Sequence, residues 1–156
     1  MKTLILFYSR TGTTKKVAEK LAVIFSADIE EIFDTVNRSG AKGYLLSGRD
    51  ATLKKMTKIK PLVHNLSDYD LVIIGTPIWA WTMSTPIRTL LTEQKDKIKQ
   101  AAFFCTQSGS GAQGAFSNMA ELINKQPLAS LNLLTKEVAQ DKISEALNNF
   151  VARINS

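Results

Sequence analysis

The first group of residues that could do chemistry is a hydroxyl-rich loop close to the amino terminus. It consists of Ser9, Arg10, Thr11, Gly12, Thr13 and Thr14, between an apolar run and a segment with helical spacing of apolar residues. Free amides and the dipole of a helix N-terminus favour an anion, and the hydroxyl groups add hydrogen-bond donors. No lysine stands in the Gly-Lys-Ser/Thr arrangement of a triphosphate loop, and the G-x-G-x-x-G dinucleotide motif is absent. The loop therefore predicts a site for a terminal monophosphate, with a simple helix cap as the alternative.

A second candidate segment holds both tryptophans of the chain, two residues apart. It follows an apolar run at residues 70–76, and no helical or strand periodicity surrounds the two rings. Tryptophan offers a flat ligand a large contact area, so the segment favours stacking against an aromatic ligand. Either tryptophan alone could instead close the end of a sheet as a core residue. The candidate contacts are Thr76, Pro77, Ile78, Trp79, Ala80 and Trp81.

A third candidate segment is the glycine-rich loop that follows the apolar run at residues 101–106. Glycines let backbone amides approach the edge of a planar ligand closely. Amide donors aimed at such an edge would stabilise negative charge that develops there on reduction. A flexible surface loop is the alternative interpretation. The candidate contacts are Thr106, Gln107, Ser108, Gly109 and Gly111.

Alternating strands and helices must position these three loops. Apolar or β-branched runs predict strands at residues 3–8, 28–33, 70–76, 101–106 and 128–135. Helical spacing predicts helices at residues 13–26, from Pro86 onward, at 116–125 and over 143–154. This alternation indicates a three-layer α/β fold, with a five-stranded parallel sheet in the order 2-1-3-4-5 and helices on both faces. All three loops then lie at the carboxyl ends of the strands, where open parallel sheets bind ligands.

The length of 156 residues fits one domain spanning residues 1–156. Within it, residues 37–60 have the least clear pattern. Apolar residues suggest a second, irregular helix there, namely Tyr44, Leu45, Leu46, Leu53 and Met56. The connection between the second and third strands, about 35 residues, is longer than a short crossover requires. We therefore expect this segment to overhang the ligand site.

The first two loops resemble those of a known family. Residues 8–18 (YSRTGTTKKVA) resemble the phosphate loop of flavodoxins, and residues 75–81 (GTPIWAW) are similar to the flavin-flanking loop of flavodoxins and flavodoxin-like reductases. The resemblance implies non-covalently bound FMN, with the first loop on the phosphate and Trp79 as the favoured ring contact. It also implies that Gln107, Gly109 and Gly111 meet the flavin edge. The third loop lacks the aromatic residue and carboxylates common in acidic carrier flavodoxins, so one flavin face would be open or covered by residues 37–60.

Three functions are compatible with these residues. The first is electron transfer to a protein partner through bound FMN, and the second is NAD(P)H-dependent reduction of quinones or similar small acceptors. The third is a non-redox domain for a phosphate-bearing ligand, against which the two tryptophans and the glycine-rich loop argue, because a bare phosphate needs neither. The net charge of +6 favours a redox partner with an acidic surface. It also predicts a less negative potential for the second electron than in acidic flavodoxins.

The remaining reactive residues indicate no further chemistry. Cys105 ends a predicted buried strand as a small core residue, and a C-x5-R phosphatase loop is excluded because Gly111 stands at the arginine position. His64 lacks a partner and is expected to be structural or exposed. One cysteine and one histidine argue against a metal site. The lysine clusters carry no interleaved aromatics and no apolar stretch reaches the roughly 20 residues of a membrane span, so we expect a cytoplasmic protein without nucleic-acid or membrane partners.

Overall fold

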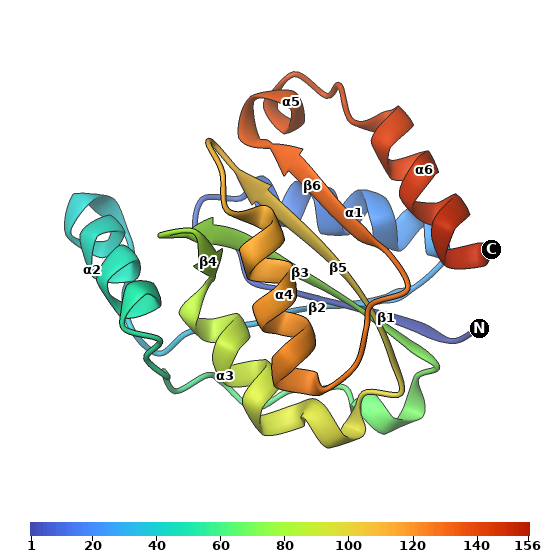
Figure 1. The fold of residues 1–156 in the computed structure, drawn as a ribbon, viewed down its shortest axis with the longest axis horizontal. Coiled ribbons are helices and arrows are strands. Elements are labelled where there is room, and N and C mark those ends of the chain that lie inside the picture. The colour runs from blue at the N-terminus through green and yellow to red at the C-terminus, as the bar shows by residue number, and fades with distance from the viewer.

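A five-stranded parallel sheet forms the centre of the computed structural model, which describes residues 1–156. The strands lie in the spatial order β2-β1-β3-β5-β6, and each neighbouring pair is parallel (Figure 1). Their bounds are β1 (Thr3–Phe7), β2 (Asp28–Glu31), β3 (Leu71–Trp79), β5 (Gln100–Gln107) and β6 (Ser130–Leu134). The predicted parallel sheet and its order 2-1-3-4-5 are confirmed. A short strand, β4 (Thr82–Met83), adds an antiparallel pair to the end of β3.

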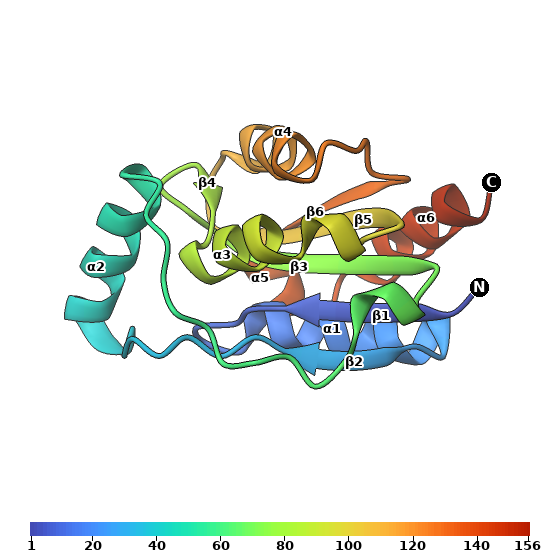
Figure 2. The ribbon, with the colours of Figure 1, turned by 90° about the horizontal axis from the view of Figure 1, so that it is seen from below.

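Helices cover both faces of this sheet. On one face lie α1 (Thr13–Phe25), α5 (Thr135–Ala139) and α6 (Ser144–Asn155), and on the other lie α3 (Thr85–Gln94) and α4 (Ala112–Ile123), as Figure 2 shows. Two 3-10 turns, Leu66–Asp68 and Lys95–Lys97, complete the connections. The two faces bury separate apolar cores. The predicted three-layer α/β architecture is therefore confirmed.

The central strand β3 shows why its sequence is apolar without alternation. Val72 and Ile74 pack into the core that α3 and α4 cover, whereas Leu71 and Ile73 pack into the core beneath α1 and α6. All four side chains are fully buried. A parallel strand with helices on both sides has no solvent-facing side, and the continuous apolar run follows from that.

Two boundaries differ from those expected, and both bear on the site. Strand β3 runs to Trp79 rather than to residue 76, because its last residues pair with β4. Helix α4 starts at Ala112 rather than at residue 116, directly after Gly111 in a left-handed conformation. The small, weakly apolar first turn of α4 gives no helical periodicity, which explains the late expected start. The glycine-rich third loop is consequently shorter than its sequence suggests.

Residues 37–60 contain a regular helix, α2 (Gly40–Thr52), which lies beyond the carboxyl ends of the strands at the left of Figure 1. Gly43 permits its close approach to the preceding chain, since a Cβ there would lie 2.1 Å from the Arg38 backbone. The Arg38 guanidinium is buried and pairs with Asp34 and with Asp50 of α2, the latter at 3.1 Å. These contacts fix a helix that covers little of the sheet itself.

The edge strand β6 has two outward-facing backbone groups bonded within the chain. Arg153 of α6 donates from Nη2 to the Ser130 carbonyl oxygen at 3.1 Å, and the Leu134 amide donates to Glu137 Oε2 at 3.1 Å. Both groups point away from β5. Among the helices, none combines the length and the hydropathy needed to cross a bilayer.

Candidate functional site

The loop between β1 and α1 leaves several backbone amides free. Ser9 Oγ accepts from the Gly12 amide at 3.0 Å and from the Lys15 amide at 3.3 Å. The amides of Thr11, Thr13 and Thr14 donate no hydrogen bond within the chain. Gly12 takes a left-handed conformation, φ 96°, directly before the helix. The loop therefore presents unpaired donors at the positive end of α1, as an anion site requires.

Two of the predicted contacts have their hydroxyl groups bonded to one another instead of facing solvent. Thr14 Oγ1 lies 2.8 Å from Thr106 Oγ1, and both side chains are buried. Thr14 can offer a ligand its backbone amide, whereas its hydroxyl ties the first loop to the end of β5. Thr76 has a similar structural role, because its hydroxyl accepts from the Ser84 amide at 3.0 Å and is fully buried.

The tryptophan-bearing segment forms a tight β-hairpin between β3 and β4. Ile78 pairs with Met83 and Trp79 with Thr82, which leaves Ala80 and Trp81 as the two turn residues. Both have positive φ, 46° and 63°, as a type I′ turn demands. Neither is a glycine or an asparagine, so the turn holds two side chains in a backbone conformation that costs about 1 kcal/mol or more each. Such local strain is characteristic of binding sites.

The two tryptophans have different surroundings. The Trp79 ring is 9% exposed and packs edge-on against Tyr8, with ring centroids 5.3 Å apart. The Arg38 guanidinium lies 5.3 Å from the centroid of the same ring. Trp81 is 71% exposed, and its Nε1 donates to Ser110 Oγ at 3.2 Å. The exposed ring is thus that of Trp81, whereas the resemblance to flavodoxins favours Trp79 as the ring contact; both side chains line the same cavity, which is described below.

The third loop packs directly on the turn of the hairpin. Gly111 has φ 113°, and a Cβ at this residue would lie 2.6 Å from Trp81 Cα. Only glycine satisfies both the conformation and the contact. Gln107, at the end of β5, is 7% exposed, and its Oε1 has no hydrogen-bond partner.

A cavity of about 650 Å³ lies between α2, the hairpin and the third loop. Its volume falls in the range of cofactor sites. It is lined by Tyr44, Leu45, Ser47, Gly48, Arg49, Ile78, Trp79, Ala80, Trp81, Gln107, Ser108, Gly109 and Ser110. Tyr44 and Leu45 of α2 expose apolar side chains on the wall that faces the hairpin. The Arg10 guanidinium lies 5.5 Å from the Tyr44 ring centroid and so connects the first loop with this wall.

Arginines and aspartates lie in and behind the wall of this cavity. Arg49 lines it, and no carboxylate does. Behind it, burial together with the nearby charge of Asp34 raises the pKa of Tyr8 to about 12, so this phenol stays neutral. Burial opposes ionisation of Asp50, but hydrogen bonds from Arg49 and Arg38 outweigh it and hold the pKa of Asp50 below its ordinary value. The one charged side chain in the lining, Arg49, is therefore paired with Asp50.

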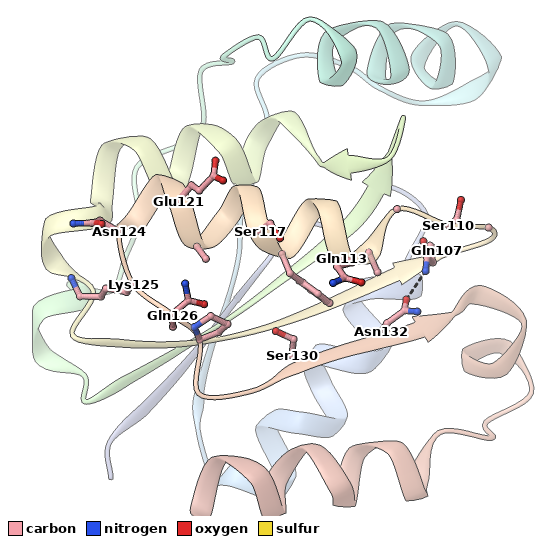
Figure 3. Close-up of a pocket in the computed structure, with 16 residues that line it drawn as sticks. Gln107, Ser110, Gln113, Ser117, Glu121, Asn124, Lys125, Gln126, Ser130 and Asn132 are labelled. Carbon is pink, nitrogen blue, oxygen red and sulfur yellow. Dashed lines mark hydrogen bonds between the residues drawn. The ribbon is translucent and has the colours of Figure 1, made fainter.

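A second and larger space adjoins the third loop. Figure 3 shows this groove between α4 and β6, with a volume of about 1150 Å³ and a lining dominated by carboxamides and hydroxyls. Gln107, Gly109 and Ser110 line both spaces. At the shared end, Gln107 Nε2 donates to Asn132 Oδ1 at 2.7 Å, the dashed line in Figure 3.

The structure brings together most, but not all, of the predicted contacts. Seven of them line the cavity, and these are Ile78, Trp79, Ala80, Trp81, Gln107, Ser108 and Gly109. The first loop lies beside it, and Thr76, Pro77, Thr106 and Gly111 support it without lining it. The segment 37–60, expected to overhang the site, supplies the α2 wall of the cavity, whereas the sequence patterns gave no indication of Arg38 or Asn132. Tyr44 and Leu45, two of the apolar residues that suggested a helix in this segment, are the ones that line the cavity.

A family model described as flavodoxin matches residues 2–150, almost the whole chain. This chain belongs to the flavodoxin family. Flavodoxins are an FMN-binding family, so membership confirms the cofactor that the loops predicted. No curated protein matches the sequence of this flavodoxin.

Solved structures place this flavodoxin among other flavoproteins. A flavoprotein from Lactobacillus acidophilus NCFM, in complex with FMN, is 28% identical with a TM-score of 0.66, over 89% of this chain and 97% of that one. A protein from Bacteroides eggerthii DSM 20697 that has been assigned as a flavoprotein is 24% identical with a TM-score of 0.73, over 93% and 97%. An NADH:FMN oxidoreductase in its apo form is 16% identical with a TM-score of 0.55, over 99% and 90%. At the last two identities the likeness shows the fold alone.

Proposed function

We propose that the chain holds FMN across the three loops and transfers electrons through it to a protein partner. The observation that carries the proposal is the convergence, at one end of the sheet, of free amides and a cavity with an exposed tryptophan. The amides of Thr11, Thr13 and Thr14, with the hydroxyls of Ser9 and Thr11, would hold the phosphate. When bound, FMN supplies the redox chemistry, and the chain supplies position and electrostatic surroundings.

The cavity walls suit the flavin ring. Trp81 offers the exposed ring on one side, and Tyr44 with Leu45 of α2 provides an apolar wall on the other. The backbone amides of Ser108, Gly109 and Ser110, which line the cavity, would meet the flavin edge. Donors at this edge stabilise the negative charge gained on reduction. Residues 37–60 would then form the outer cover of the flavin.

Binding titrations test this proposal. The apo protein is expected to take up FMN with quenching of flavin fluorescence and to become yellow. Riboflavin lacks the phosphate and is expected to bind at least about tenfold more weakly, because charge-assisted hydrogen bonds to the amides are lost. A protein that stays colourless with excess FMN would contradict the proposal. Equal affinity for FMN and riboflavin would show that the first loop is only a helix cap.

The partner is proposed to have an acidic surface. Arg10 and Arg49 lie at the cavity, the chain carries a net charge of +6, and no carboxylate lines the cavity. Complementary charge speeds encounter and orients the two proteins. Electron transfer to an acidic carrier is expected to slow as the salt concentration increases. At one low salt concentration, Lys42→Glu on exposed α2 should transfer electrons more slowly than the wild type. Lys99→Glu, at the opposite end of the sheet, is the matched control and should have little effect; equal effects would contradict a docking surface at the cavity.

A second candidate function is NAD(P)H-dependent reduction of a quinone or similar small acceptor. The groove between α4 and β6 favours it, because the groove adjoins the third loop and has room for a second small molecule. Steady-state oxidation of NADH and NADPH, with a quinone and with a protein acceptor, separates the two functions. Turnover with the quinone at ordinary enzyme rates supports the reductase. Negligible turnover, with fast exchange to a protein, supports the carrier.

A further inference from the structure

Two arginines of this chain are buried, and they differ in how their charges are balanced. Arg38 is 4% exposed, and its guanidinium pairs with the carboxylates of Asp34 and Asp50. Arg88, near the start of α3, is 7% exposed and pairs with no carboxylate. Burial lowers the pKa of Arg88, but an arginine stays charged at neutral pH all the same. Because buried charges in proteins are normally paired, the counter-charge of Arg88 is missing from the chain.

The Arg88 guanidinium lies where α3, α4 and β4 meet. Its Nη2 donates to Thr82 Oγ1 of β4 at 3.3 Å, and Asn118 Nδ2 of α4 donates to the same oxygen at 3.2 Å. The two helices lie side by side over one face of the sheet, with β4 beside the start of α3 (Figure 1). A hydroxyl oxygen carries only a partial charge, so Thr82 orients the guanidinium without neutralising it.

One nitrogen of this guanidinium is open to a further partner. Nη1 donates no hydrogen bond within the chain and keeps accessible surface, whereas Nε is enclosed. Every guanidinium nitrogen is a donor, so the open position is a donor whichever way the neighbouring Asn118 carboxamide is turned. The missing partner must therefore supply an acceptor and a negative charge.

A carboxylate fits this position better than a phosphate does. Its single negative charge balances the single positive charge of Arg88, whereas the second charge of a phosphate would stay uncompensated in a buried place. Its two oxygens also match the spacing of the two terminal nitrogens of a guanidinium. Nη2 gives one of its two protons to Thr82, so it keeps the other for a ligand.

We propose that Arg88, oriented by Thr82, is a binding site for one carboxylate where α3, α4 and β4 meet. The site is separate from the flavin cavity, because neither residue lines that cavity. It shares the hairpin with the cavity, since Thr82 directly follows Trp81. Two sources supply such a group, namely a small organic acid and a glutamate or aspartate side chain of a protein that approaches the exposed Trp81.

The first test is NMR spectroscopy of protein with isotope-labelled arginine side chains. The chain has five arginines, so the Arg88 signal is assigned from its loss in Arg88→Met or Arg88→Lys. On titration with sodium formate at constant ionic strength, the Arg88 signal is expected to shift and to saturate in the millimolar range. The Arg38 signal should stay in place, because that guanidinium is already paired. Inorganic phosphate at the same concentrations should bind more weakly.

Two results of this titration would overturn the proposal. The first is an Arg88 signal that does not move, and the second is an equal shift of all five arginine signals, which would show only a general effect of the salt. Tighter binding of phosphate than of formate would overturn the choice of a carboxylate.

The stability of the free protein gives a second, independent test. Arg88→Met keeps a long side chain and removes the uncompensated charge, so it is expected to be at least as stable as the wild type. Arg38→Met is the matched variant, and it should unfold at a clearly lower urea concentration because Asp34 and Asp50 lose their partner. Formate should raise the urea midpoint of the wild type but not that of Arg88→Met. If Arg88→Met unfolds as easily as Arg38→Met, the Arg88 charge is balanced within the chain and the proposal is wrong.

A peptide distinguishes the two sources of the carboxylate. A short peptide with blocked ends and a single glutamate carries only a side-chain carboxylate, and the same peptide with glutamine is its control. A shift of the Arg88 signal by the glutamate peptide alone supports a protein partner, whereas a shift by formate without one by the peptide supports a small organic acid. Each titration is done without FMN, so a failure to bind FMN would contradict the proposed function and leave this inference standing.

Discussion

Thr14 Oγ1 and Thr106 Oγ1 lie 2.8 Å apart and form a buried bond between the first turn of α1 and the end of β5. The two residues belong to different loops, one proposed to hold the phosphate and the other next to the flavin edge. Between β1 and β5 lies β3, so the bond bridges the end of the central strand. The two ends of the proposed ligand site are therefore held at a set distance before any ligand arrives, which lowers the entropic cost of binding.

Removal of this bond should affect both stability and binding. Thr14→Val leaves the Thr106 hydroxyl buried without its partner, which is expected to lower the free energy of unfolding by about 1–3 kcal/mol. Thr14→Ser should keep the bond and most of the stability. Urea unfolding of the apo proteins is the measurement, followed by FMN titration of the folded variants. Thr11→Ala, at an exposed residue, should weaken FMN binding without changing the free energy of unfolding. A loss of stability in Thr11→Ala as large as that in Thr14→Val would contradict the separate roles of the two threonines.

The hairpin turn offers a stabilising substitution. Ala80 has φ 46°, a conformation that glycine adopts without strain, so Ala80→Gly is expected to raise the free energy of unfolding by about 0.5–1 kcal/mol. Gly111→Ala should have the opposite effect, because its Cβ would meet Trp81 Cα at 2.6 Å. Thermal unfolding of the two variants beside the wild type measures both. A loss of stability in Ala80→Gly would show that the turn is not strained.

The ion pairs that hold α2 should fail in acid. The pKa of Asp50 is lowered in the folded chain, so its charge stabilises the protein above the ordinary value of 3.8, and this stabilisation is lost as pH falls through the lowered pKa. Asp50→Asn should be less stable at neutral pH and should lose less on acidification below about pH 4. Unfolding free energies of both proteins, measured as a function of pH, check this. Parallel curves for the two proteins would contradict it.

Cys105 should be inert in the native protein. Burial raises the pKa of its thiol to about 12 and also excludes reagents from the sulfur. Labelling with a chromogenic disulfide at pH 8 is expected to be negligible in the folded state and complete in denaturant. Rapid stoichiometric labelling without denaturant would mean that the end of β5 opens easily.

The positive surroundings should appear in the redox potential. The chain has a net charge of +6, and no carboxylate lines the cavity. The negative charge that the flavin gains on reduction is therefore repelled less than in acidic flavodoxins. The potential of the second electron is therefore expected to be less negative than theirs. Salt softens the effect because distant charges are screened beyond about 8 Å. A redox titration that gives a potential as low as in acidic carriers would refute it.

The fold was predictable because its determinants are local or periodic. Apolar runs at residues 3–8 and 70–76 indicate strands buried on both faces, and their alternation with helices leaves few topologies. The first loop was predictable as well, since its glycine and hydroxyls precede a helix directly. These features need no knowledge of distant residues.

The rest of the site depends on packing that no motif records. The hairpin turn consists of Ala80 and Trp81 in place of the Asn-Gly pair that would mark it in a sequence. Which tryptophan is exposed depends on Tyr8 and Arg38, far away in the chain. The α2 wall is held by charge pairs across residues 34–50, and Asn132 reaches Gln107 only through strand register. Such relationships appear only in three dimensions.

The bonds of Arg153 and Glu137 to the outer backbone of β6 also affect how copies of this protein behave toward one another. An edge strand with free amides and carbonyls is a template on which a strand from a second molecule can add, the first step toward a fibril. Here two of the backbone groups that such a strand would need are already occupied by side chains of the same molecule. A second strand that adds to β6 would have to displace both of these bonds, so they oppose growth of the sheet at this edge.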